Sequence, residues 1–232
     1  MVKLPLLSTK HLERIAEANS VVVIGLGRFG GALALELAAA GTEVLGIDMD
    51  EDIVQSFNGR LTHVVRADST KEEVLRQLSV HEFDRAVVGI GSDLEASILT
   101  TSALLRFQKP VIWAKAVSIQ HGQILEQLGV EHVVHPEQDM GRRVAHLVRG
   151  SMLDYVEFED GFAMVKSRPP TEVLGRPLEA TGMRPKYHVT IVAMKRKGGE
   201  WQHTTAHTVL EHDDEIMVVG AARDAERFAA LR

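Results

Sequence analysis

The feature that most constrains the fold is a glycine-rich segment, Gly25-Leu26-Gly27-Arg28-Phe29-Gly30, between an apolar run and an alanine- and leucine-rich run. The first run, residues 20–25, is typical of a buried strand, and residues 30–40 favour a helix. In such a strand–turn–helix, Gly25 permits the turn, Gly27 lets a phosphate approach the backbone and Gly30 allows close helix packing. We therefore predict a nucleotide-binding loop rather than a tight turn without a ligand.

Alternating apolar and helical segments follow this loop. Further strands are expected at 43–48, 62–66, 85–90, 110–114 and 130–134, and helices at 50–57, 71–78, 94–107 and 119–128. Alternation of this kind is typical of a parallel sheet with helices over both faces, whose strands lack polar alternation. The pattern predicts a Rossmann-type, doubly wound α/β domain over residues 19–136.

The pattern changes after residue 136. Residues 136–149 favour a helix with an apolar stripe, and we assign 137–152 to a crossover helix. Short strands at 153–158, 162–167, 189–195 and 215–219, a hairpin turn at 159–161 and a helix at 222–231 predict a second, smaller α+β domain over 153–232. Residues 1–18 form an N-terminal extension in which 11–18 could be a brief helix.

The composition and the missing motifs exclude several classes of function. The chain has no cysteine, which excludes disulfides, thiolate metal sites and cysteine nucleophiles. A formal net charge of −6 argues against nucleic-acid binding, and no apolar run is long enough to span a bilayer. The glycine loop lacks the Lys-Ser/Thr ending of a phosphoryl-transfer loop, and His188, His203, His207 and His212 lack metal-helix spacing. We expect a soluble binding protein and not an enzyme; an NAD-dependent oxidoreductase and an NADH-sensing regulator are the alternatives.

Asp48 ends the second predicted strand, about 20 residues beyond the glycine loop. A carboxylate at this position accepts hydrogen bonds from ribose hydroxyls and repels a 2′-phosphate, so NADP is disfavoured. Asp50, Glu51 and Asp52 are competing candidates, and Asp50 or Asp52 could cap the next helix instead.

Two further loops border the predicted ligand crevice. Asp68 and Ser69 follow the third strand and could contact an adenine or cap the next helix. Gly89 and Gly91 follow the fourth strand, where missing side chains would leave room for a ligand.

Two charged residues suggest what that ligand is. Arg28, inside the glycine loop, suits a longer phosphate tail than a dinucleotide offers. Glu137 could bind a divalent cation beside a phosphate, or could simply stabilise the first turn of its helix.

Five segments, 21–31, 43–48, 89–101, 111–116 and 135–141, together resemble the Ktr/Trk potassium-uptake regulatory subunits of the RCK (KTN, TrkA-N/TrkA-C) domain family. The resemblance runs from about residue 19 to the C-terminus. It implies dimers assembled into a cytosolic octameric ring, docked on a membrane-embedded potassium channel at the inner face of the membrane. It also implies activation by ATP and inactivation by ADP without required turnover.

The resemblance also implies roles for individual residues. Arg28 would hold nucleotide phosphates, those of a neighbouring subunit, Asp48 would hold the ribose, and Glu137 would bind Mg²⁺, Ca²⁺ or Na⁺. Phe29 and Lys115 lie in the matching segments and join the nucleotide-binding candidates. Cyclic di-AMP binding in the smaller domain is implied more loosely, with Arg184, Lys186, Tyr187 and His188 as candidate contacts. Ala67-Asp68-Ser69-Thr70 replaces the Asn-Ala-Thr of many relatives, which puts base or metal preference in doubt.

Overall fold

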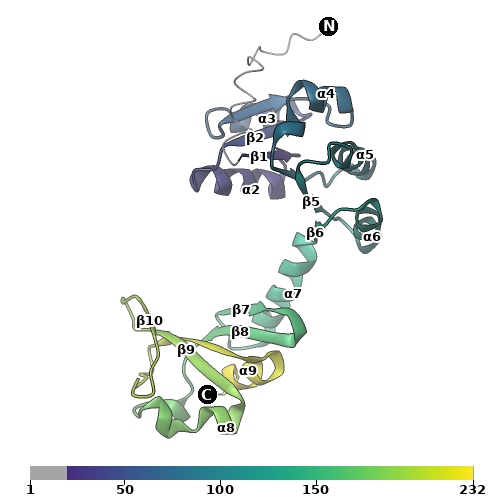
Figure 1. The fold of residues 1–232 in the computed structure, drawn as a ribbon. Helices are drawn as coiled ribbons and strands as arrows, with labels where there is room; N and C mark the ends of the chain where they lie inside the picture. Colours follow the sequence, from purple (N-terminus) through teal and green to yellow (C-terminus); the bar gives the residue numbers. More distant parts are fainter. Residues whose placement is uncertain (1–19, 232) are drawn as a thin grey trace. The chain divides into compact units, whose positions relative to one another are not determined.

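The computed structural model describes residues 20–231 and divides into two compact units between Glu137 and Gln138. The first unit is a parallel α/β sheet and the second is a smaller antiparallel sheet with helices (Figure 1). The predicted fold class is therefore confirmed. The N-terminal extension and the brief helix expected at 11–18 lie outside the described residues. Within them, no helix is long and apolar enough to cross a membrane.

The first unit contains six parallel strands in the order β3-β2-β1-β4-β5-β6. This order reverses direction between β1 and β4, which creates the crevice where ligands bind in doubly wound sheets. All six predicted strands are confirmed, with ends that shift by up to two residues: β1 Val21–Ile24, β2 Val44–Asp48, β3 His63–Arg66, β4 Arg85–Val88, β5 Val111–Lys115 and β6 His132–Val134.

Helices connect these strands on both sides of the sheet, as Figure 1 shows. Helices α2 and α3 pack on one face, and α4, α5 and α6 pack with the 3-10 turn η1 on the other. Their bounds are α2 Arg28–Ala39, α3 Glu51–Phe57, α4 Glu72–Gln77, η1 Val80–Glu82, α5 Leu94–Leu105 and α6 Ile119–Leu128.

The strand β1 shows why the apolar runs form a buried sheet. Val21 and Val23 pack toward α2 and α3, whereas Val22 and Ile24 pack toward the opposite core. Both faces are therefore dry, and each fully buried aliphatic side chain contributes about 1.5–3 kcal/mol.

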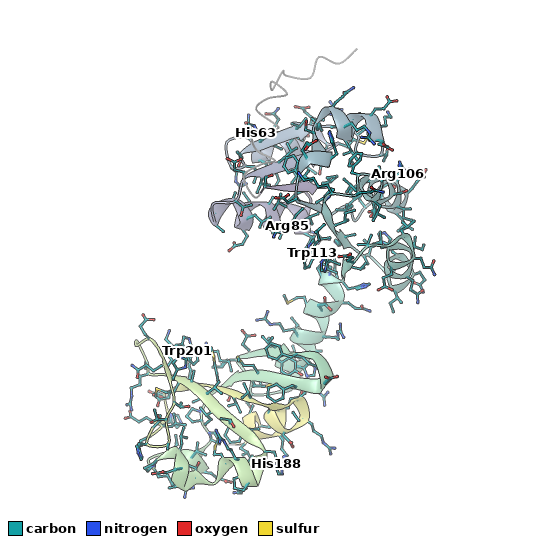
Figure 2. The ribbon with its side chains drawn as sticks, viewed as in Figure 1. His63, Arg85, Arg106, Trp113, His188 and Trp201 are labelled. Atoms are coloured by element: carbon teal, nitrogen blue, oxygen red, sulfur yellow. The ribbon has the colours of Figure 1, made fainter. Side chains whose placement is uncertain are left out.

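Strand β5 is covered by helices on one face only, so our expectation that helices cover both faces of the whole sheet was wrong. Ile112 and Ala114 are buried under α5 and α6, but Val111 and Trp113 on the opposite face are 41% and 39% exposed. Trp113, labelled in Figure 2, stacks on His132 of β6, and their ring centroids lie 4.1 Å apart. Only two helices cover this face in the described first unit, and they lie over the other strands, so an apolar surface remains open.

Helix α7 spans Pro136–Arg149, as the apolar stripe predicted, and so ends three residues before residue 152, the end assigned to the crossover helix. Met140, Val144 and Val148 on its apolar stripe are exposed, whereas Leu147 packs against the second core. His146 stacks on Tyr155 with ring centroids 4.1 Å apart and bonds Glu226, and Arg143 Nη2 lies 2.6 Å from Asp154 Oδ1. These contacts fix the second half of α7 to the smaller unit.

The second unit is a five-stranded antiparallel sheet in the order β10-β9-β11-β8-β7. The predicted hairpin at 159–161 is confirmed, since β7 pairs with β8 across it. Strand β10 and the short helix α8 were not predicted. The elements are β7 Asp154–Glu157, η2 Glu159–Gly161, β8 Phe162–Ser167, η3 Thr171–Val173, η4 Leu178–Thr181, α8 Met183–Tyr187, β9 Val189–Lys195, β10 Trp201–His203, β11 Glu215–Ala221 and α9 Ala222–Ala229.

Candidate functional site

The carboxyl ends of the parallel strands open into a cavity of about 790 Å³ within the first unit. Its walls are the loops after β1, β2, β3, β4 and β5, together with the first turn of α7. This is the crevice at the topological switch point. All the predicted ligand residues of the first unit except Gly30 line it, namely Gly25, Gly27, Arg28, Phe29, Asp48, Asp68, Ser69, Gly89, Gly91, Lys115 and Glu137.

The glycines at positions 27 and 30 of the loop are explained by different physical causes. A Cβ on Gly30 would lie 1.9 Å from the carbonyl oxygen of Gly25, so this glycine is needed for packing. Gly27 has φ −63°, which any residue adopts, and a Cβ there would meet no atom within 4 Å. Neither backbone strain nor packing requires a glycine at this position. The open space beside Gly27 is what a closely approaching ligand needs.

The first turn of α2 provides donors for an anion. Gly27 is its N-cap, and no described side chain caps the helix. Unbonded N–H groups and the helix dipole therefore face the cavity from the loop that also carries Arg28 and Phe29.

Asp48 holds the glycine loop in place. Its Oδ2 accepts a hydrogen bond from the Leu26 amide at 2.7 Å, and its Oδ1 accepts one from the Asp50 amide at 3.0 Å. Each carboxylate oxygen has a second lone pair, so the group can still accept from ribose hydroxyls. Asp50 caps α3 by accepting from the amides of Asp52 and Ile53, which confirms capping as its role.

Asp68 and Ser69 do not cap α4, so that alternative is wrong. The N-cap of α4 is Lys71, without a side-chain cap bond. Asp68 Oδ1 accepts from both the amide and the hydroxyl of Thr70, and these bonds together with Lys71 keep the pKa of Asp68 below its usual range. The Ser69 hydroxyl pairs with Thr100 of α5 at 2.9 Å. Asp68 therefore presents a fixed negative charge at the cavity wall.

The loop after β4 passes close to the glycine loop. A Cβ on Gly89 would lie 2.9 Å from the Gly25 carbonyl oxygen, so packing alone explains Gly89. Asp93 caps α5 by accepting from the Ala96 amide at 2.9 Å. Several cavity residues were not singled out from the sequence, although most lie in the same loops: Met49, Ile53, Thr70, Ser92, Asp93 and Val117.

Lys115 and Glu137 meet at the end of the cavity beside the glycine loop. Lys115 ends β5, and its Nζ lies 2.6 Å from Oε1 of Glu137, the second residue of α7. The hydrogen bond from Lys115 holds the pKa of the Glu137 carboxyl below its usual range, with a smaller contribution from the charge of Arg28. Two cations and one carboxylate are thus grouped beside the glycine loop.

The donor set for a cation is incomplete in a single chain. No group of three or more His, Cys, Asp or Glu side chains is placed to hold a metal within residues 20–231. Glu137 is 62% exposed and offers oxygen ligands, which Mg²⁺ and Ca²⁺ prefer. A cation here fits only if phosphate oxygens, water or a second chain supply its other ligands.

The smaller unit contains a second cavity of about 570 Å³. Of the four candidate contacts for cyclic di-AMP, Arg184 lines it and donates from Nε to Thr190 Oγ1 at 3.1 Å. Lys186 and Tyr187 instead bond Glu172, and His188 (Figure 2) ends α8 in a left-handed conformation. Polar residues missed from the sequence also line the cavity, among them His203, Thr204 and Thr205.

The fold and first cavity define a protein with a Rossmann-type ligand-binding unit joined to a small α+β unit. A TrkA-N domain model matches residues 21–136, and a TrkA-C domain model matches residues 163–232. The chain belongs to the TrkA-N/TrkA-C (RCK) family of Ktr and Trk potassium-uptake proteins.

Individual relatives support this assignment over most of the chain. The Ktr system potassium uptake protein C of Bacillus subtilis is 38% identical over 207 residues, covering 89% of this chain and 94% of that protein. Protein A of the same system and organism is 34% identical, covering 89% and 93%. Protein A of Vibrio alginolyticus is 32% identical, covering 85% and 90%.

Solved structures agree on the fold. The GsuK RCK domain superposes with a TM-score of 0.64 at 15% identity, covering 91% of this chain and 47% of that one. A structure of the GsuK channel bound to NAD has a TM-score of 0.64 at 16% identity, covering 92% and 38%.

Proposed function

We propose that this chain is a cytosolic regulatory subunit that gates a membrane-embedded potassium channel or transporter in response to ATP and ADP. Its similarity to Ktr system potassium uptake proteins over nearly their whole length supports the potassium-transport role. In this proposal the chain works at the inner face of the membrane through its partner, binds no nucleic acid and performs no required catalysis.

The observation that carries the nucleotide part of the proposal is the open backbone at Gly27. Its glycine is unexplained by conformation or packing, and the adjacent uncapped α2 N-terminus favours an anion. A phosphate beside Gly27 would lie on the loop that carries Arg28. Asp48 would then accept from the ribose, and Asp68 would lie at the base end.

ATP and ADP share base and ribose, so a protein that distinguishes them must sense the terminal phosphate. A ligand shifts a conformational equilibrium only by its difference in affinity for the two states. Arg28, Lys115 and Glu137 are the charged residues grouped where a phosphate tail would end. A tenfold preference requires only about 1.4 kcal/mol, and coupling between sites in a ring would increase the response.

A cation, Mg²⁺, Ca²⁺ or Na⁺, would be held by Glu137 together with phosphate oxygens. When bound, it would neutralise phosphate charge and bridge the nucleotide to α7. The incomplete donor set of a single chain is consistent with a site completed by the nucleotide or by a second subunit.

Assembly into dimers and an octameric ring is the second part of the proposal. Val111 and Trp113 on β5 and the Met140, Val144 and Val148 stripe of α7 expose apolar side chains that are normally covered in a folded assembly. A second copy of this chain supplies surfaces of matching apolar chemistry.

NAD(H) is the alternative nucleotide, because Asp48 suits an unphosphorylated ribose and one RCK-containing channel was solved with NAD bound. Cyclic di-AMP is proposed for the second cavity, where Arg184 provides a cation for phosphate. Of the four residues first suggested for it, we keep only Arg184 in the proposal, because Lys186, Tyr187 and His188 do not line this cavity.

The test is thermal unfolding of the purified chain with ATP, ADP, NADH, NADPH and cyclic di-AMP, each with and without Mg²⁺. A ligand of the native state raises the melting temperature. We expect stabilisation by ATP and ADP, and none by NADPH. Stabilisation by NADH alone would favour the alternative, and indifference to adenine nucleotides would overturn the proposal. A deletion strain that takes up potassium normally would remove the transport role.

A further inference from the structure

Lys115 is the only buried lysine or arginine among residues 20–231. Its side chain is 10% exposed, whereas that of its partner Glu137 is 62% exposed. Burial of an ammonium group is unfavourable unless a counter-charge accompanies it. Since Glu137 is the carboxylate bonded to Lys115, this pair satisfies the lysine in the absence of a ligand.

The surroundings restrict where the ammonium can lie. A Cβ on Gly91 would come within 3.1 Å of Nζ and 3.6 Å of Cε, so the glycine leaves the space that the lysine occupies. The Phe29 ring lies on another side, with its centroid 5.9 Å from Nζ. Because the side chain is buried, a change of partner could involve only its ammonium end, which lies at the cavity wall.

The same contact occupies the carboxylate proposed to bind a cation. With Nζ 2.6 Å from Oε1, a divalent ion on Glu137 would face a like charge at close range. Glu137 and Lys115 both line the cavity in which a phosphate tail would end. The lysine and a cation would therefore compete for one carboxylate, in the cavity that a phosphate tail would enter.

We propose that Lys115 is an exchangeable counter-ion that couples nucleotide binding to cation binding. Without nucleotide, Lys115 neutralises Glu137 and weakens its affinity for a cation. When a polyphosphate enters, the ammonium transfers its hydrogen bonds to a phosphate oxygen, and Glu137 becomes available to the cation. The exchange moves no proton. It rests on the proposed function, because the entering anion is taken to be the nucleotide.

This assignment makes Lys115 a positioning residue for the cation site, with a thermodynamic consequence. Coupling between two ligands is reciprocal, so the cation must strengthen nucleotide binding by the factor by which the nucleotide strengthens cation binding. The device would make the protein respond to the nucleotide and its cation together, and little to either alone.

The first experiment measures Ca²⁺ binding to the full chain by calorimetry without any nucleotide. Lys115→Met preserves length and apolar character, and we expect it to tighten Ca²⁺ binding by about tenfold or more. The gain should vanish in Lys115→Met/Glu137→Gln. Lys109→Met is the control, because it removes the same charge from a residue near the opposite end of β5, paired with Glu82 and Asp84.

An unchanged nucleotide-free Ca²⁺ affinity in Lys115→Met, within about twofold of wild type, would overturn the exchange, as would a gain that survives the double substitution. Lys115→Gln repeats the test if the methionine variant fails to fold. This arm contains no nucleotide, so a wild-type chain that ignores ATP would refute the proposed function separately.

A second arm compares the affinity for ATP in EDTA with that for preformed Ca²⁺–ATP. In the wild type, the metal complex should bind more tightly, and in Lys115→Met that advantage should grow, because free ATP then meets a Glu137 carboxylate that no ammonium neutralises. An advantage of the same size in both proteins would contradict the proposal.

Discussion

The Asp48 carboxylate accepts a 2.7 Å hydrogen bond from the amide of Leu26, which ties the end of β2 to the glycine loop 22 residues earlier. One side chain thus fixes the loop and faces the cavity. The strand order places β1 and β2 side by side, so the loop and its anchor are adjacent wherever the sheet forms.

Asp48→Asn separates these two roles. The amide oxygen can still accept from Leu26, but the bond from the exposed Asp50 amide is lost, so we expect a loss of stability of about 1 kcal/mol. The negative charge is also gone. Binding of ATP or NADH should weaken by about tenfold, and discrimination against NADPH should fall, because repulsion of its 2′-phosphate is removed. Calorimetric titration with NADH and NADPH checks this, and unchanged rejection of NADPH would show that Asp48 does not face the ribose.

Gly27→Ala tests the open backbone. Its φ of −63° suits alanine and its Cβ would meet no atom within 4 Å, so the variant should fold with wild-type stability. If a phosphate lies there, nucleotide affinity should fall by about tenfold or more.

Gly30→Ala is the matched comparison, because its Cβ would lie 1.9 Å from a carbonyl oxygen. It should destabilise the first unit by about 3 kcal/mol or more. Denaturant unfolding and ATP titration of both variants check the pair. Wild-type ATP binding by Gly27→Ala would exclude the loop as the phosphate site.

The parallel sheet could be predicted from sequence because its evidence is local. Continuous apolar runs such as Val21–Ile24 indicate strands that are buried on both faces of the sheet. The glycine motif marks the strand after which the order of the sheet reverses. Strand β10 (residues 201–203, with Trp201 labelled in Figure 2) escaped prediction, since its three residues are largely exposed and their pairing with β9 is the main reason for their extended shape.

The residues of the candidate site also divide into those that could be predicted from the sequence and those that could not. Residues of the strand-end loops, such as Asp48 and Gly89, could be assigned because topology places all those loops together. The Lys115–Glu137 contact could not be predicted, because it joins the end of β5 to the first turn of α7, 22 residues later, and depends on the reach of both side chains. The bare face at Trp113 was missed because an apolar strand reads the same whether helices or a second chain cover it.

Arg28→Ala should weaken binding of ATP far more than binding of adenosine, because in the proposed site the guanidinium would contact phosphate and neither base nor ribose. Loss of one charge-assisted contact predicts about a tenfold to hundredfold reduction for ATP. Competition titrations with ATP, ADP and adenosine measure it. Equal losses for ATP and adenosine would refute the role of Arg28.

Val144→Asp tests the α7 stripe as an assembly surface. A charge buried against apolar side chains is unfavourable, so the variant should form a smaller oligomer than the wild type. The dissociation constant of the assembly should rise by about tenfold or more. Gln138→Asp adds the same charge to α7 about 120° around the helix from Val144, off the apolar stripe, and is the control. Light scattering after size-exclusion chromatography reports the mass, and identical masses for wild type and Val144→Asp would argue against this surface.

Acid should weaken the ion pair between Arg143 of α7 and Asp154 of β7. Hydrogen bonds from Arg143 hold the pKa of Asp154 below its usual range, so the folded chain binds that proton less tightly than the unfolded chain. Its stabilisation is full above the ordinary aspartate value, about 3.9, and is lost as pH falls through the lower folded value. The difference in unfolding free energy between wild type and Asp154→Asn should therefore shrink between pH 7 and about pH 3. A difference in unfolding free energy that stays constant with pH would show that Asp154 does not couple protonation to stability.

The most direct test of the central claim is calorimetric titration of the wild-type chain with ATP and with ADP, both with Mg²⁺. Recognition of the terminal phosphate by the Arg28, Lys115 and Glu137 group predicts that ATP binds more tightly by about tenfold, or about 1.4 kcal/mol. Equal affinities for the two nucleotides, or no binding of either, would contradict the account.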